Sequence, residues 1–395
     1  MARRRGVGLA AACLALVAVD QLLAHTVLGD DRFFEIQVAP FDPPLFSPSQ
    51  FQVLERIRAQ VAGQAPATTR FDPELGWCNP PGGGFGEFRY DWAGARLGAE
   101  PLAREPAPGL RRIVTVGCSM THGEEVGARE SWCAQLDEAL PEVEVANLGV
   151  AAYGLDQALL RLRRDGFPLE PEEVWLGLLP QAALRITTTF RPLLDHWSLD
   201  VAFKPRFELD AQGQLVPIAC PARTLEDCVR LLGDQQVFLD EVGRLDPWVQ
   251  QTPGAFAPRG SDWRHHFFLG RVSLTLAEKR GRGLEAAFDD ESPSGRLLTA
   301  IVRSARAECE ARGVRFRLLV LPGRSDLERL ERGERGYWQD WLARRRAEGL
   351  AVVDLADALR ADGGAAELFA PHGHFSPRGS RVVAEALAPL LRRSD

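Results

Sequence analysis

The chain has 395 residues, of which 45% are hydrophobic and 26% are charged, and its formal net charge at pH 7 is −7. This length suits one large domain with additions, and the hydrophobic share suits a globular core. The acidic balance, with no long basic run in the body of the chain, argues against a surface that binds polyanions, so we expect no nucleic-acid partner.

The N-terminus differs from the rest of the chain. Three arginines at 3–5 precede the uncharged stretch 6–19, and after Asp20 the apolar character resumes over 22–28. A basic flank before an apolar stretch is typical of an export signal, and no clear cleavage site follows it. We predict an uncleaved signal anchor, a transmembrane helix at 1–28, that leaves the N-terminus in the cytoplasm and the body in the periplasm. A buried soluble helix is the alternative.

Residues 29–106 are rich in proline and glycine and are expected to form a stalk and wrapping segment, interrupted by one helix at about 49–62. The main domain is expected over 107–395. Its first strand, about 112–116, ends at Gly117-Cys118-Ser119, and a helix-starting segment follows. Such a turn exposes a serine hydroxyl at the carboxyl edge of a parallel sheet, where open α/β folds bind ligands. An ordinary N-cap serine is the alternative for Ser119.

Strands and helices then alternate. Strands are predicted at 143–147, 174–179, 314–321 and 350–355, and helices at 131–139, 155–165, 294–312, 335–348 and 380–391. This alternation predicts an α/β fold in which helices cover both faces of a parallel sheet.

An insertion at 186–293 breaks the alternation, and its segment 205–217 is predicted to form a β-hairpin. Its large aromatic side chains either line a substrate cleft or close over the core. The residues concerned are Trp197, Trp248, Trp263, His265, His266, Phe267 and Phe268.

A second polar loop precedes the last helix. It contains His372-Gly373-His374, followed by Phe375-Ser376-Pro377. A serine after an early strand and a histidine in a late loop are the two parts that a hydroxyl nucleophile and its general base require.

Taken in order, these segments resemble the blocks of the SGNH (GDSL-like) hydrolases, in particular bacterial, membrane-tethered members. The blocks are Gly117-Cys118-Ser119-Met120-Thr121-His122-Gly123, then 147–157, then Pro180-Gln181-Ala182, then the loop of His374, with 71–77 as an upstream lead-in. The resemblance implies a flavodoxin-like three-layer sandwich with a central parallel sheet, and a serine esterase or acyl transferase that needs no cofactor.

The resemblance assigns roles to individual residues. Ser119 falls on the nucleophile and His374 on the general base. The oxyanion donors fall on the backbone N–H groups of Ser119 and Ala152 and on the side-chain amide of Gln181. The aspartate that orients the histidine in the family falls on His372 or the residue before it, and neither is a carboxylate.

Three further expectations concern these departures. A neutral His372 can accept a hydrogen bond but stabilises an imidazolium less well than a carboxylate. Ala152 stands where the family has glycine, so we expect its N–H to serve only if its φ is negative. Asp354 is a second candidate for the missing carboxylate, although a helix N-cap is its more common role.

The cysteines suggest two further hypotheses. Cys220 and Cys228 flank a short polar loop and are the first candidates for a disulfide in an exported body. Cys118 is either a buried filler or, in a third reading of the site, the nucleophile of a thioesterase. No Cys-x-x-Cys or His-x-x-x-His spacing occurs, so we predict no metal site.

The leading functional hypothesis is an extracytoplasmic, membrane-anchored serine esterase that forms an acyl-enzyme on Ser119. Its substrate would be a small-molecule, polysaccharide or lipid ester. A polysaccharide O-acyltransferase of the same fold is one alternative, and a catalytically degenerate module that binds glycans or lipids is another.

Overall fold

A central five-stranded sheet organises the molecule. The computed structural model describes residues 2–28, 32–33, 36–38, 48–64, 69–98, 100–194, 203–251, 260–279 and 283–392. The strands of the sheet are β7 (Arg111–Val116), β8 (Val143–Asn147), β9 (Glu173–Leu178), β12 (Arg315–Val320) and β13 (Val352–Asp354). All neighbours pair in parallel, in the order β13-β12-β9-β7-β8. The five strands predicted from the sequence are confirmed.

This strand order is the flavodoxin-like one. Counted within the sheet from β7, it is 2-1-3-4-5, in which the chain first adds β8 on one side and then β9 on the other. The carboxyl ends of β7 and β9 therefore flank the switch point, the place where such sheets bind ligands. Ser119 follows β7 and Gln181 follows β9, so the topology brings two of the predicted site residues to this place.

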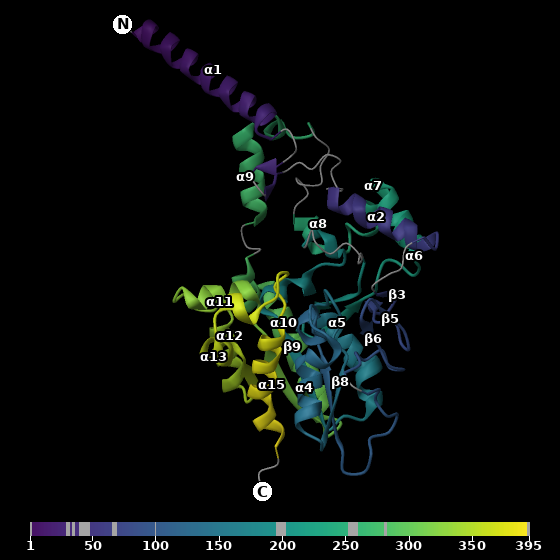
Figure 1. Cartoon of the computed structure of the whole chain (residues 1–395). Coiled ribbons are helices and arrows are strands. Elements are labelled where there is room, and N and C mark those ends of the chain that lie inside the picture. Colours follow the sequence, from purple (N-terminus) through teal and green to yellow (C-terminus); the bar gives the residue numbers. More distant parts are fainter. Residues whose placement is uncertain are drawn as a thin grey trace.

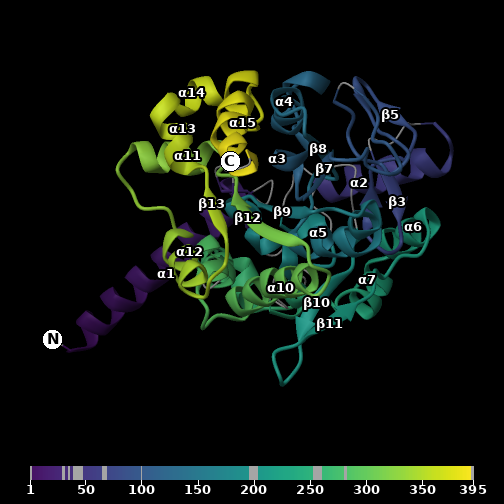
Figure 2. The same cartoon turned by 90° about the horizontal axis from the view of Figure 1, so that it is seen from below.

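Helices cover both faces of the sheet, as Figure 2 shows end-on. One buried apolar cluster packs α4, α13 and α15 against the sheet, and a second cluster does the same for α5, α10 and α12. The bounds are α3 (Ser119–His122), α4 (Trp132–Ala139), α5 (Leu155–Arg161), α10 (Pro293–Glu310), α11 (Arg324–Glu331), α12 (Gln339–Ala347), α13 (Ala356–Asp362), α14 (Ala365–Leu368) and α15 (Pro377–Leu391).

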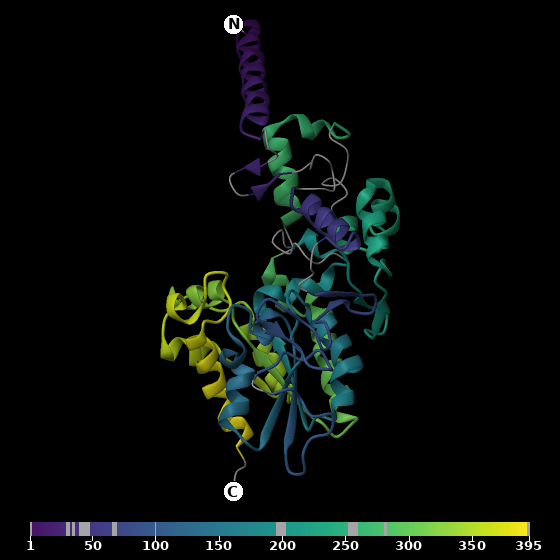
Figure 3. The same ribbon diagram turned by 45° about the vertical axis from the view of Figure 1, so that its right-hand side comes forward.

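The insertion and part of the upstream segment form a lobe beyond the sheet (Figures 1 and 3). A third apolar cluster joins α2 to α6 and α7. The predicted hairpin is confirmed as β10 and β11, which pair antiparallel. The lobe contains α2 (Pro48–Val61), α6 (Leu225–Gly233), α7 (Gln235–Glu241), α8 (Pro247–Gln251) and α9 (Phe268–Lys279). The hairpin of β10 (Arg206–Leu209) and β11 (Leu215–Ile218) packs on the cluster of α5 and α10.

Short elements complete the chain. The small strands are β1 (Arg32–Phe33), β2 (Ile36–Gln37), β3 (Arg70–Asp72), β4 (Gly76–Cys78), β5 (Gly84–Phe85) and β6 (Phe88–Arg89). The 3-10 segments are η1 (Ala128–Glu130), η3 (Phe167–Leu169), η4 (Pro180–Thr187), η5 (Arg191–Leu193), η6 (Trp263–His266) and η7 (Leu284–Phe288), and a π-helical turn, η2 (Leu162–Gly166), extends α5.

The N-terminal segment forms a helix, α1 (Ala2–Thr26), that projects from the lobe (Figure 3). Its Asp20 accepts a hydrogen bond from the backbone N–H of Leu269, near the start of α9. Among the described residues, no helix combines the length and the apolar character that crossing a membrane requires. The predicted transmembrane anchor is therefore not confirmed.

Candidate active site

The turn that carries Ser119 is held tightly between two strands. Ser119 is the first residue of α3, directly after β7, and it is 7% exposed. A Cβ atom on Gly117, the residue after β7, or on Gly177 of β9 would lie 2.2 Å from the Thr121 hydroxyl oxygen. Only glycine therefore lets the first turn of α3 sit this close to both strands, which fixes where the chain leaves the sheet at Ser119.

The loop after β8 packs directly on this turn. The side-chain amide of Asn147 donates to the carbonyl oxygens of Thr121 at 3.0 Å and of His122 at 3.2 Å. The N–H of Val150 donates to the carbonyl oxygen of Gly117 at 3.1 Å. A Cβ atom on Gly149 would lie 2.3 Å from the His122 backbone nitrogen, so a glycine is needed at this approach. The loop of Ala152 is thus fixed beside the loop of Ser119.

Ala152 adopts the left-handed backbone conformation that glycine favours. Its φ is 64°, whereas we expected a useful donor here only with negative φ; the condition is not met. Both flanking carbonyl groups are bonded: Trp77 Nε1 donates to Ala151 at 2.9 Å, and Arg191 Nε donates to Ala152 at 3.2 Å. The alanine therefore keeps a glycine-type conformation because distant side chains hold it there.

The carboxylate partner of His374 is Glu125. Its Oε2 atom lies 2.9 Å from His374 Nδ1 and accepts the backbone N–H of His374 at 3.1 Å, while Oε1 accepts the N–H of His372 at 2.9 Å. Burial raises the pKa of Glu125, but these hydrogen bonds and the interaction with His374 outweigh it and leave the pKa lowered. An ionised carboxylate only accepts, so Nδ1 carries the proton and Nε2 is the basic nitrogen.

This geometry corrects the assignment of His372. Its side chain is exposed, and its backbone N–H, not its imidazole, takes part in the site. Asp354 is not the substitute either, because its carboxylate accepts from Trp338 Nε1 at 3.0 Å and from the Ala356 N–H at 3.1 Å at the start of α13. Asp354 thus accepts the first N–H of α13 from the position before Leu355, which is the N-cap residue.

Sequence reasoning missed Glu125. It stands next to Glu124 in a loop of ordinary composition, and 249 positions separate it from His374. Neither its contact with His374 nor its positive φ of 65° can be read from the neighbouring residues in the sequence. The only signal was its place just after the serine block.

A second imidazole, that of His122, lies on the same loop as Glu125. His122 is fully buried; its Nδ1 lies 3.0 Å from Glu124 Oε1 and its Nε2 lies 3.1 Å from the Tyr90 hydroxyl. Burial lowers the pKa of His122. Burial raises the pKa of Glu124, but His122, His374 and Arg96 together lower it. The loop 122–125 therefore presents one glutamate to the interior and the next to His374.

Two predicted contacts of the site stay predictions. Among the described residues, no hydrogen bond joins Ser119 to His374, although Glu125 ties the loops that carry them. Gln181 places its Oε1 atom 2.9 Å from the Ser325 hydroxyl, which donates to it, and its amide lies against Gly323. This contact fixes the Gln181 side chain to the start of α11, which follows β12. Its role as an oxyanion donor stays a prediction.

The cysteines do not form the predicted pair. Cys220 and Cys228 are free thiols buried in the apolar cluster of the lobe, and burial raises the pKa of Cys220 to about 11. The predicted disulfide is therefore wrong for this structure. Cys118 packs in the core beside the sheet, which is the filler role expected for it. No metal-binding group of His, Cys, Asp or Glu occurs within the described part of the chain.

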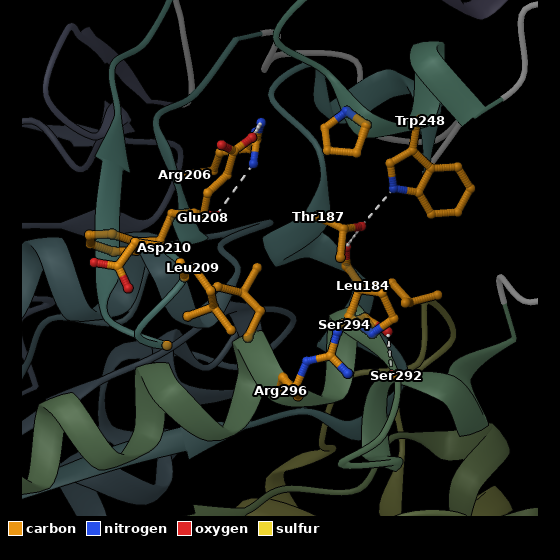
Figure 4. A pocket seen from close by; sticks show the side chains of 16 residues that line it. Leu184, Thr187, Arg206, Glu208, Leu209, Asp210, Trp248, Ser292, Ser294 and Arg296 are labelled. Carbon is orange, nitrogen blue, oxygen red and sulfur yellow. Dashed lines mark hydrogen bonds and ion pairs between the residues drawn. The ribbon is translucent and has the colours of Figure 1, made fainter.

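A pocket of about 610 Å³ lies between the β10–β11 hairpin, α8 and the start of α10 (Figure 4). Trp248 lines it and donates from Nε1 to the Thr187 hydroxyl at 2.6 Å, at the far end of η4 from Gln181. Trp263 is not in its lining and is 71% exposed, and Trp197 lies outside the described residues. The predicted catalytic residues do not line this pocket.

Comparison with known proteins gives one sequence relative and several structures. No family model matches the chain. The chain is similar to the probable alginate O-acetylase AlgJ of Pseudomonas aeruginosa, with 34% identity over 122 residues, which cover 27% of this chain and 31% of AlgJ. The matched stretch thus spans less than a third of that relative.

The structural neighbours cover more of the chain at low identity. They include a lipolytic protein of the G-D-S-L family from Desulfitobacterium hafniense, with 12% identity and a TM-score of 0.35, covering 71% of this chain and 99% of the other. An acetylxylan esterase from Geobacillus stearothermophilus, Axe2, in a catalytic mutant form, has 13% identity and a TM-score of 0.35, covering 73% and 95%. The fold and the site described above rest on this chain's own residues.

Proposed function

We propose that this chain, a relative of the SGNH (GDSL-like) hydrolases, is a serine enzyme that acts on ester bonds through an acyl-enzyme on Ser119. The observation that carries the proposal is the Glu125–His374 pair, with Nδ1 of the imidazole 2.9 Å from the carboxylate. It supplies the orienting carboxylate that the sequence lacked next to the histidine. The missing group was one of three reasons for the degenerate binding module, beside Ala152 and Gln181.

The residues then divide the chemistry in the usual way for a serine nucleophile. His374 Nε2 takes the proton of the Ser119 hydroxyl as its oxygen attacks the ester carbonyl, and Glu125 stabilises the imidazolium that forms. The N–H group of Ser119 and the side-chain amide of Gln181 stabilise the oxyanion, whereas Ala152, with its positive φ, does not meet the condition set for its N–H. The carbon–oxygen bond to the alcohol breaks, and the alcohol leaves with the proton from His374.

Two acceptors can complete the cycle. Water gives hydrolysis, whereas a hydroxyl group of a polysaccharide gives O-acylation. The similarity to a protein named as a probable alginate O-acetylase favours the transfer reaction as the second candidate. In both cases His374 removes the proton of the acceptor, and the acyl–serine bond breaks.

The first experiment is fluorophosphonate labelling of the full-length protein, followed by peptide mapping. We expect the label on Ser119, none in Ser119→Ala, and unchanged labelling in Cys118→Ala. Loss of labelling in Cys118→Ala alone would favour the thioesterase reading. An unlabelled wild-type protein that also gives no turnover of p-nitrophenyl acetate would refute the proposed enzymatic activity.

A second experiment determines whether water or a saccharide hydroxyl accepts the acyl group. The protein is incubated with p-nitrophenyl acetate and an uncharged or uronic-acid oligosaccharide, and the products are analysed by mass spectrometry. A saccharide heavier by one acetyl group indicates transfer, and free acetate alone indicates hydrolysis.

We also propose an extracytoplasmic location for the body of the protein, supported by the basic residues at 3–5 before the uncharged stretch 6–19. Alkaline phosphatase fused after residue 392 should be active in a bacterial host, and deletion of 2–28 should abolish that activity. Equal activity without the segment would contradict this location.

A further inference from the structure

We propose that Arg96, in the segment upstream of the main domain, is a positioning residue that holds Glu125 against His374. The inference rests on the proposed function, because it assigns the residue that sets the carboxylate of that same site. Arg96 does not contact His374 itself, so its effect passes through the loop 122–126.

The guanidinium group of Arg96 spans that loop. Its Nη1 atom donates to the carbonyl oxygen of His122 at 2.8 Å and also to that of Gly123, and its Nη2 atom donates to that of Val126. Arg96 thus binds carbonyl groups on both sides of Glu125. The side chain is 6% exposed, so these bonds form away from water.

The loop needs such support because its backbone is unusual. Glu125 has a φ of 65°, in a region that non-glycine residues rarely adopt, and Gly123 has a φ of 86°. Conformations of this kind persist where the surroundings determine them. Without Arg96, the buried carbonyl groups of Gly123 and Val126 would lose their donor and that of His122 would keep only Asn147, so the loop would be free to relax.

The approach of Arg96 is itself closely fitted. A Cβ atom on Gly123 would lie 2.8 Å from its Nη1 atom, and its guanidinium lies 4.7 Å from the centre of the Phe88 ring. Its backbone N–H donates to the carbonyl oxygen of Asn147 at 2.8 Å, which fixes it to the end of β8. A planar fork with several donors fits these carbonyl groups, whereas a lysine ammonium would reach fewer of them.

The same upstream segment holds the neighbouring loop. Trp77 donates to the carbonyl oxygen of Ala151 at 2.9 Å, and the side-chain amide of Asn79 donates to that of Gly149 at 3.0 Å. Residues 70–97 therefore contact both loops of the site, and Arg96 is the member that acts on the carboxylate.

The test compares Arg96→Lys and Arg96→Ala with the wild-type full-length chain in two measurements. The first is hydrogen exchange by mass spectrometry of peptides that contain the N–H groups of His372 and His374, both bonded to Glu125. We expect exchange there to be about tenfold faster or more in both variants. The second is the rate of fluorophosphonate labelling of Ser119, which we expect to fall about 100-fold.

Two controls separate positioning from general stability. Arg345→Lys removes donors from another buried arginine, on α12, which bonds Thr299 on α10 and Asp290 just before α10; it lies away from the site and should change neither measurement. Millimolar guanidinium ion should restore part of the labelling in Arg96→Ala, since it fits the space that the side chain leaves. If Arg96→Ala does not fold, Arg96→Lys decides alone.

Wild-type protection of the His372 and His374 amides in the variants would overturn the proposal, because Glu125 would then be placed without Arg96. The exchange measurement does not depend on activity. If wild-type Ser119 stays unlabelled, the proposed function fails while the exchange result still decides the role of Arg96.

Discussion

At the scale of single residues, the site depends on a carboxylate that stands in an unexpected place. The position near the histidine where the resemblance places an aspartate holds His372, and the carboxylate that contacts His374 is Glu125, on the loop that follows Ser119. A triad is defined by the geometry of its groups and not by their order in the chain, so this arrangement is compatible with the proposed chemistry. It also places Ser119, the proposed nucleophile, and Glu125 on the same segment after β7.

Replacing the charge of Glu125 tests its role. In Glu125→Gln the amide oxygen can still accept from Nδ1–H, but it carries no negative charge to stabilise the imidazolium, so we expect acyl-ester turnover to fall by about 10³–10⁴-fold. The matched control is Glu124→Gln, which removes the neighbouring charge that faces His122. It should retain most of the activity. Equal losses in the two variants, measured with p-nitrophenyl acetate, would contradict the assignment.

Replacing Ala152 by glycine is expected to stabilise the protein. A left-handed conformation costs a non-glycine residue about 1–2 kcal/mol, which exceeds the entropy that a glycine adds to the unfolded chain. We therefore expect Ala152→Gly to raise the free energy of unfolding by about 0.5–1 kcal/mol in urea titrations. Ala151→Gly, at a neighbour that does not have positive φ, should lower it. A destabilised Ala152→Gly would show that the alanine is not strained.

At the scale of elements, the insertion supports the site as well as extending the fold. Lys204, just before β10, forms an ion pair with Asp156 in the first turn of α5, and both side chains are fully buried. Arg191 of η5 bonds the carbonyl oxygen of Ala152. The insertion therefore fixes the start of α5 and the loop that leads into it.

Breaking this buried pair should be costly. Lys204→Met leaves the Asp156 carboxylate buried without its cation, and we expect a loss of about 3–5 kcal/mol in the free energy of unfolding. The double variant Lys204→Met with Asp156→Asn should recover most of the loss, because no buried charge remains. Arg230→Ala, which breaks an exposed pair with Glu241, should change stability far less. Chemical denaturation of the four proteins checks the order.

At the scale of the whole molecule, the partly buried carboxyl group of Asp137 makes stability depend on pH. Burial raises the pKa of Asp137 on α4 from 3.8 to about 7, although its Oδ1 atom accepts the Val145 N–H at 2.6 Å. A folded-state pKa above the unfolded value means that the contribution of Asp137 to stability is most favourable below about 3.8 and declines as the pH rises to about 7. Above that pH the penalty stays constant.

Asp137→Asn removes this dependence and keeps an acceptor for Val145. We expect its melting temperature to exceed that of the wild type at pH 8 and to match it near pH 4. Glu138→Gln, at an exposed neighbour on the same helix, should follow the wild type at both values. A constant difference between Asp137→Asn and wild type across this range would refute the shifted titration.

The sequence by itself determined the α/β architecture, because buried strands and amphipathic helices leave local patterns of apolar residues. It also determined where the serine block and the histidine loop stand. Only the tertiary structure decided that Glu125 meets His374 across 249 positions, that Ala152 takes a positive φ, and that Cys220 and Cys228 stay apart as thiols. Each of these depends on contacts between segments far apart in the chain, which the residues beside them do not encode.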